Sequence, residues 1–180
     1  NLQNLNCANA NNGSITINVT SGIQPYSYQW TNNVSNSNSA SNLAAGNYIV
    51  TVTDNAGCVV TSSNNITSPT AITIQTVSQQ NVKCFGNNTG NINIAASGGT
   101  GTLSYLWSNG NTTSSVTSLT MGNYSVTVTD QNNCTKQQSF TITQPASALS
   151  SSTTPVSTSC GLNNGAALVV PAGGTTPYKF

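Results

Sequence analysis

The chain reads Leu43-Ala-Ala-Gly-Asn-Tyr-Ile-Val-Thr-Val-Thr-Asp54 and, 76 residues further on, Leu119-Thr-Met-Gly-Asn-Tyr-Ser-Val-Thr-Val-Thr-Asp130. In both copies the tyrosine and the two valines alternate with Thr, Ile or Ser. A period of two residues is typical of a strand that buries one of its faces. The stretch therefore predicts a half-buried β-strand that occurs once in each copy of an internal repeat.

The repeat extends well beyond this stretch and has a length of about 76 residues. Tyr28-Gln-Trp30 matches Tyr105-Leu-Trp107, and the cysteines recur at positions 7, 84 and 160 and at positions 58 and 134. Because proline cannot donate to a sheet ladder, we place the repeat boundaries near Pro69 and Pro145. The predicted domains are residues 1–69, whose first strand can be incomplete, residues 70–145, and residues 146–180 as the truncated start of a third repeat.

Within each repeat, six or seven short alternating runs are separated by Gly- and Asn-rich turns, and no segment carries a helical stripe. This pattern predicts an all-β protein built from tandem immunoglobulin/fibronectin-III-like β-sandwich repeats. The Gly-x-Tyr start of the repeated stretch resembles the tyrosine corner of those sandwiches, so each tyrosine should make one hydroxyl hydrogen bond. We also expect each Trp to be the buried Trp of a central strand. The predicted core consists of Tyr28, Trp30, Tyr48, Val50, Val52, Tyr105, Trp107, Tyr124, Val126 and Val128.

The composition excludes several classes of function. Asn, Ser and Thr make up 80 of the 180 residues, whereas only three Lys and two Asp carry charge and His is absent. Acid–base catalysis has almost no residues to draw on, so we expect no enzyme and no cofactor. A net charge of +1 does not provide the positively charged surface that binds the phosphates of a nucleic acid. No apolar run is long enough to span a membrane.

Each repeat places one aspartate, Asp54 or Asp130, directly after its central strand. Aspartate at such a position commonly accepts hydrogen bonds from the backbone amides of the following turn. A calcium site is the alternative, although calcium usually takes more than one carboxylate. We therefore expect a turn residue in both repeats.

The combined pattern resembles the SprB-type repeat. The second copy carries it most fully, from Cys84 through Tyr105-Leu-Trp107 and Leu119 to Asp130 and Cys134. The first copy departs in its loops, with Asn9 where the second has Gly86 and a longer segment at residues 33–42. The resemblance covers the whole chain.

The resemblance implies a long adhesin on the surface of gliding Bacteroidetes-like bacteria, exported by type IX secretion. The partners it implies are the neighbouring repeats and the gliding and secretion machinery, and the repeats would form the shaft of the filament. The alternative is an Ig-like adhesive module that binds surface glycans or another protein.

The five cysteines lack the close pairs that a zinc site needs, and a secreted array favours disulfides. Repeat symmetry suggests Cys7–Cys58 and Cys84–Cys134, which leaves Cys160 for a partner downstream. Immunoglobulin order would instead put these cysteines at opposite ends of a sandwich, and head-to-tail stacking would then bring Cys7 near Cys134. Free or intermolecular thiols are the third possibility.

Overall fold

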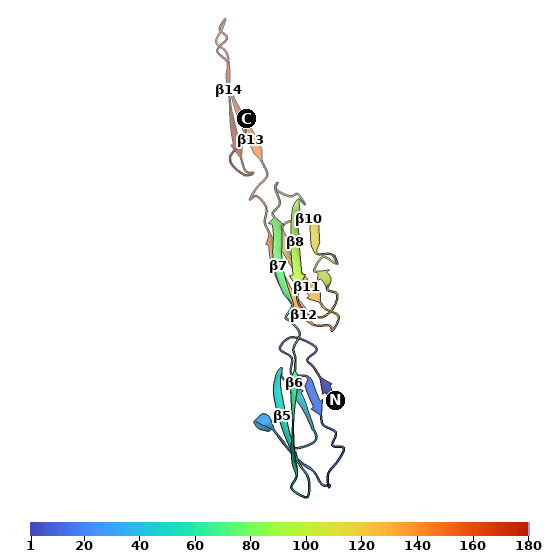
Figure 1. Ribbon diagram of the computed structural model, residues 1–180. Coiled ribbons are helices and arrows are strands. Elements are labelled where there is room, and N and C mark those ends of the chain that lie inside the picture. Colours follow the sequence, from blue (N-terminus) through green and yellow to red (C-terminus); the bar gives the residue numbers. More distant parts are fainter. Residues whose placement is uncertain (180) are drawn as a thin grey trace. The chain divides into compact units, whose positions relative to one another are not determined.

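The structure is a computed structural model that describes residues 1–179, and among these residues it is all-β apart from one short 3-10 turn (Figure 1). The first repeat holds two three-stranded antiparallel sheets. One sheet has the order β1-β2-β4 and the other the order β3-β5-β6. Their strands are β1 (Leu2–Gln3), β2 (Gly13–Thr16), β3 (Ser27–Trp30), β4 (Ser39–Leu43), β5 (Gly46–Thr53) and β6 (Val59–Ile66), and the turn η1 (Thr31–Asn33) follows β3.

The second repeat has the same strand order, β7-β8-β10 in one sheet and β9-β11-β12 in the other. Its strands are β7 (Thr73–Gln80), β8 (Gly90–Ser97), β9 (Ser104–Trp107), β10 (Ser115–Leu119), β11 (Gly122–Thr129) and β12 (Thr135–Ile142). A separate antiparallel hairpin of β13 (Ser150–Val156) and β14 (Ala166–Ala172) follows. No helix in residues 1–179 has the length and hydropathy needed to cross a membrane.

This strand order confirms the predicted fold class. The sheets correspond to strands A-B-E and C-F-G of an immunoglobulin constant-type sandwich, without strand D. The segments Leu2–Ile66 and Thr73–Ile142 each hold six strands, within the predicted number. Within each segment, short turns join the strands, and glycine or asparagine takes a left-handed conformation in some of them, as at Gly57 and Asn133.

The chain divides into two compact units. Unit 1 consists of Asn1–Thr73, Ala96–Ser104 and Val128–Lys136, so it includes two loops from the second sequence repeat. Unit 2 consists of Ile74–Ala95, Tyr105–Thr127 and the chain from Gln137 onward. The borders of the units therefore differ from the boundaries of the sequence repeats, because unit 1 includes the turn that follows β11.

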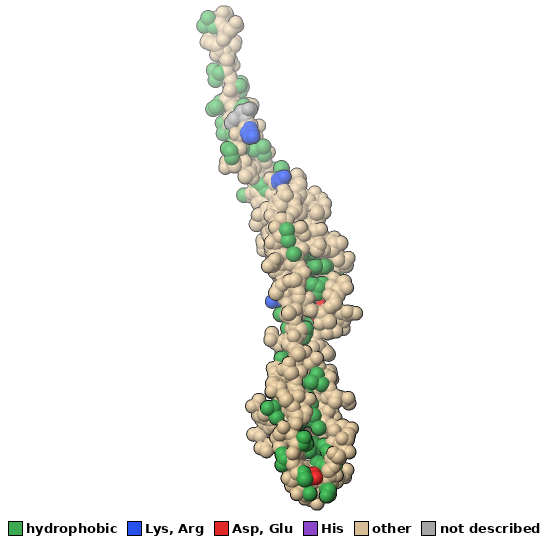
Figure 2. Space-filling model, viewed as in Figure 1, with side chains coloured by type: hydrophobic (Ala, Val, Ile, Leu, Met, Phe, Trp, Pro, Cys, Tyr) green, Lys and Arg blue, Asp and Glu red, His purple; other side chains and the backbone are tan. Residues whose placement is uncertain are grey.

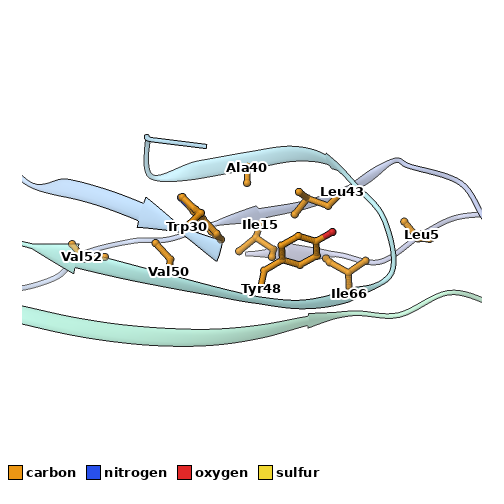
Figure 3. Packing of buried hydrophobic residues seen from close by; sticks show 9 residues of the cluster. All are labelled: Leu5, Ile15, Trp30, Ala40, Leu43, Tyr48, Val50, Val52 and Ile66. Atoms are coloured by element: carbon orange, nitrogen blue, oxygen red, sulfur yellow. The ribbon is translucent and has the colours of Figure 1, made fainter. Parts of the chain in front are cut away.

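Apolar side chains from both sheets of the first repeat meet in one core (Figure 3). Ile15 and Leu43 project from one sheet, while Trp30, Val50 and Ile66 project from the other. Burial of apolar surface from two facing sheets is the main stabilising term for such a domain. Of the predicted core residues here, Trp30, Tyr48, Val50 and Val52 are buried and Tyr28 packs partly buried against them.

In the second repeat, Trp107, Val126 and Val128 are buried, whereas Tyr105 and Tyr124 are half-buried. The tyrosine-corner prediction is confirmed in both copies. The hydroxyl of Tyr48 donates to Ala44 O at 3.2 Å, and that of Tyr124 donates to Thr120 O at 3.2 Å. These bonds fix the start of β5 and of β11.

The expectation that each Trp lies on a central strand is wrong. Trp30 ends β3 and Trp107 ends β9, and both strands are at the edge of their three-stranded sheets. Both side chains are nevertheless buried, and each indole N–H donates to a backbone carbonyl at 2.8 Å. A bulky side chain that points inward is buried by the facing sheet, so its strand does not need a neighbouring strand on both sides.

Candidate functional site: a disulfide-linked joint

The most distinctive site of the molecule is a disulfide between Cys7 and Cys134, two residues separated by 127 positions in sequence. Their Cα atoms are 5.6 Å apart, well within the range that a disulfide spans. Cys7 belongs to the first sequence repeat and Cys134 to the second, yet both lie in compact unit 1. The bond therefore fastens the turn after β11 to the loop between β1 and β2.

The expected bonds within each repeat, Cys7–Cys58 and Cys84–Cys134, are corrected by this pairing. The loop of Cys7 lies at the end of the sandwich where Gly46 pairs with Ile66, and Cys58 lies where Thr53 pairs with Val59. The eight residues of β5 separate these ends by roughly 25 Å at about 3.3 Å per residue. A disulfide cannot cover that distance. The interrepeat pairing, one of the alternatives left open by the sequence, is the one in the structure.

Local contacts hold the Cys7 loop in place. The buried side chain of Leu5 belongs to the core cluster, and its backbone N–H donates to Thr67 O at 3.0 Å. In return, Thr67 N–H donates to Asn4 Oδ1 at 2.9 Å. Past the cysteine, Ala10 N–H donates to Cys7 O at 3.2 Å, which closes a tight turn. The sulfur is thus presented from a loop fixed on both sides.

The aspartate turn holds Cys134, and the prediction that Asp130 is a turn residue is confirmed. One carboxylate oxygen accepts the N–H groups of Asn132 and Cys134, both at 2.9 Å, and the other accepts Thr100 N–H at 2.8 Å. Asp54 makes the equivalent contacts in the first repeat. Such bonds fix the backbone that carries the cysteine.

Two further contacts lie beside the disulfide. The side-chain amide of Asn132 donates to Asn6 O at 3.0 Å. The sulfur of Cys134 lies 3.3 Å from the same oxygen, and because it is part of a disulfide it has no proton to donate. One neutral hydrogen bond at an exposed site contributes about 1 kcal/mol, so the covalent bond is the dominant link.

The charge of Asp130 adds to the stability of this turn. Although burial raises its pKa, the backbone N–H donors of Cys134, Thr100 and Asn132 together leave the pKa below the ordinary aspartate value. A lowered pKa stabilises the fold above the unfolded-state pKa of about 3.9, and this contribution is lost as pH falls through the folded-state pKa. For Asp54 the N–H of Ile23 is the largest cause of the same downward shift in pKa.

We expect Asp130→Asn to lower the urea midpoint of unfolding at pH 7, since the carboxylate acceptor is lost. The gap between wild type and variant should narrow as pH falls from about 3.9 through the lowered folded-state pKa of Asp130, because the wild-type carboxyl group becomes protonated over this range. Urea titrations at pH 7 and at a series of pH values from 4 down to 2 check this, with Asp54→Asn as the matched change in the first repeat. A gap that stays constant across this pH range would contradict a role for the charge.

The other thiols remain free in the described part of the chain: Cys58, Cys84 and Cys160 are all exposed. No group of three or more His, Cys, Asp or Glu side chains within residues 1–179 is placed to share a metal ion. The chemistry that this site shows is that of a covalent cross-link.

In a comparison with known proteins, two segments of the chain match the model of a repeat family. The family model described as "SprB repeat" matches residues 1–35 and 76–112, which confirms the resemblance for these segments. No curated protein matches the chain.

Solved structures with similarity to the chain include the amphioxus IgVJ-C2 molecule. The identity is 16% and the TM-score 0.34, over 76% of this chain and 98% of that one. Another is the structure of Dpr2 Ig1-Ig2 in complex with DIP-Theta Ig1-Ig3. Here the identity is 11% and the TM-score 0.31, over 80% of this chain and 65% of that one.

Proposed function

Because the chain carries two SprB-repeat segments, residues 1–35 and 76–112, we propose that it is part of the shaft of a long, repetitive adhesin on a bacterial cell surface. In this proposal the protein is exported by type IX secretion, serves attachment and gliding, and has no catalytic role. Its principal partners are the neighbouring repeats of its own chain, together with the gliding and secretion machinery.

The observation that carries this proposal is the Cys7–Cys134 bond. Tension applied to the two ends of the chain passes from Cys7 directly to Cys134, so the residues between them bear none of it. The strands of both repeats lie mostly inside this closed loop. Because the covalent bond keeps the closed loop from extending under load, the arrangement suits a shaft that transmits force, whereas ligand binding alone gives no reason for it.

The surface chemistry also supports a shaft. On the face drawn in Figure 2, charged side chains are few and scattered among uncharged polar ones. Solvation thus comes mainly from the hydroxyl and amide groups of Ser, Thr and Asn. Since screening by salt acts on charges, we infer that the stability of the shaft varies little with ionic strength.

The alternative, an adhesive module for glycans, has less support. Sugar recognition by stacking needs an exposed aromatic ring, but Trp30, Trp107 and Tyr48 are buried and the other tyrosines are half-buried. Phe85 is the aromatic residue of the described chain with an exposed side chain, and it exposes 46% of its surface.

Labelling and a binding screen test the proposal together. Antibodies raised against this chain are expected to label intact cells of the bacterium that produces it, and protease treatment of those cells should remove the label. On a glycan array, the purified chain should show no saturable binding. Label that appears only after lysis would overturn the surface location. Saturable glycan binding that Phe85→Ala abolishes would favour the adhesive module.

A further inference from the structure

The turn that carries Cys134 on one side of the disulfide has a counterpart with the same hydrogen bonds around Cys58. Asp54 accepts the N–H groups of Ala56 and Cys58, both at 2.9 Å, as Asp130 does for its own turn. Asp54 N–H donates to Cys58 O at 3.0 Å, and the equivalent bond between Asp130 and Cys134 is also 3.0 Å. The backbone that presents the bonded cysteine thus recurs at an exposed, free one.

The loop that carries Cys7 on the other side of the disulfide likewise has a counterpart with equivalent hydrogen bonds around Cys84. Val82 is buried and its N–H donates to Thr143 O at 2.9 Å, as Leu5 N–H does to Thr67 O. Thr143 N–H donates to Asn81 Oδ1 at 3.0 Å. Asn87 N–H donates to Cys84 O at 3.1 Å and closes the same turn that follows Cys7.

Exposed apolar side chains lie beside both free cysteines. Val59 and Val60 follow Cys58 directly, and Ile23 is hydrogen-bonded to the same turn; these three side chains expose 59–62% of their surface. Phe85 follows Cys84, and with the exposed Met121 it lines a shallow groove. By contrast, the bonded Cys7 and Cys134 are followed by Ala8 and Thr135. Contiguous exposed apolar surface is a feature of protein contact sites, so we take these side chains as the contact surface of each free cysteine.

We propose that Cys58 and Cys84 are the two complementary halves of the same covalent joint, each fitted to another repeat of this type. We call the loop between the first two strands of a repeat (β1 and β2, or β7 and β8) the A–B loop, and the turn between its last two strands (β5 and β6, or β11 and β12) the F–G turn. The pairing rule is that of the Cys7–Cys134 bond: the cysteine of an A–B loop bonds to the cysteine of the F–G turn in the following repeat. Cys84 and Cys160 then take F–G turn cysteines, and Cys58 takes an A–B loop cysteine. This inference rests on the proposed function as an array and names its cross-link.

Formation of the bond requires an oxidant, for which glutathione disulfide serves in vitro. The thiols of Cys58 and Cys84 lose two protons and two electrons in total as their sulfur–sulfur bond forms. The disulfide bond of the oxidant breaks and takes up both, giving two molecules of reduced glutathione. Exchange proceeds through a mixed disulfide and needs accessible thiols, and both cysteines are exposed.

Two copies of the chain with complementary cysteines test the pairing rule. In a Cys160→Ser background, one copy carries Cys58→Ser and the other Cys84→Ser, and one of them is isotopically labelled. Each variant alone in a glutathione redox buffer should stay monomeric. An equal mixture should give a dimer whose Cys84–Cys58 peptide identifies the link, at least about tenfold in excess over either homodimer.

Indiscriminate pairing would give the heterodimer as only half of all dimers and would overturn the rule. Loss of the Cys7–Cys134 peptide through exchange would overturn it as well. Neither result would alter the labelling or array outcomes, so the shaft proposal and the pairing rule can fail separately.

A second measurement separates guided docking from chance collision of thiols. Val59→Asp with Val60→Asp, in the copy that keeps Cys58, should slow formation of the heterodimer several-fold. Val77→Asp is the matched control, because Val77 is equally exposed but lies on β7. Equal rates for all three proteins would overturn the role of the apolar patch.

Discussion

Replacing both Cys7 and Cys134 with serine is expected to lower the free energy of unfolding by about 4–5 kcal/mol. A cross-link stabilises the fold mainly by restricting the unfolded chain, and a loop of more than 100 residues lies at the upper end of that effect. The loop closed here spans 127 positions. Denaturant titration of the oxidised wild type and the double variant measures the difference.

The free cysteines provide the control for this prediction. Serine at Cys58, Cys84 and Cys160 together should leave the unfolding free energy of the monomer within about 0.5 kcal/mol of wild type, because substitutions at exposed positions usually cost no more. If this triple variant lost as much stability as the double variant, the stabilising cross-link would lie elsewhere in the chain.

Trp107→Ala is expected to cost about 3–5 kcal/mol, the usual range for removing a large aromatic side chain from a core. Trp107 exposes 2% of its surface, and its ring centroid lies 5.6 Å from that of Phe140. Its indole N–H donates to Thr113 O at 2.8 Å, so the substitution also leaves that carbonyl without its partner. Urea unfolding followed by circular dichroism measures the loss.

Leu106 offers a matched control for this change, since it precedes Trp107 on β9 and its side chain is exposed. Leu106→Ala should change the unfolding free energy by no more than about 0.5 kcal/mol. Trp107→Phe should fall between the two, because it keeps an aromatic ring in the core and loses the N–H donor. Equal losses at positions 106 and 107 would contradict the inward orientation of the tryptophan.

Much of the fold follows from local patterns in the sequence. The alternation at Tyr48, Val50 and Val52 depends on the two-residue period of a strand, and burial follows that period in the structure. Asp54 and Asp130 were equally predictable, because an aspartate before a turn satisfies nearby amides whatever the rest of the chain does. Each of these features is decided within a few residues.

The partner of Cys7 was not predictable in the same way. The repeat register shows which loops hold cysteines, and it fits bonds within a repeat as well as bonds between repeats. The choice depends on which end of the sandwich each loop occupies, and β5 puts Cys58 at the far end from Cys7. The edge position of Trp30 was missed for a related reason, since strand order in a sheet is a long-range property.

The central claim is that one disulfide between Cys7 and Cys134 lets tension bypass most strands of the two repeats, and a single-molecule pulling experiment tests it directly. When the disulfide is reduced, a chain held at its two termini should gain about 42–46 nm of contour length, from 127 positions at about 3.3–3.6 Å each. Without a reductant, this length should stay closed at the same force. Bonds within each repeat would instead enclose about 50 residues apiece. Two separate gains of about 17 nm on reduction would contradict the account.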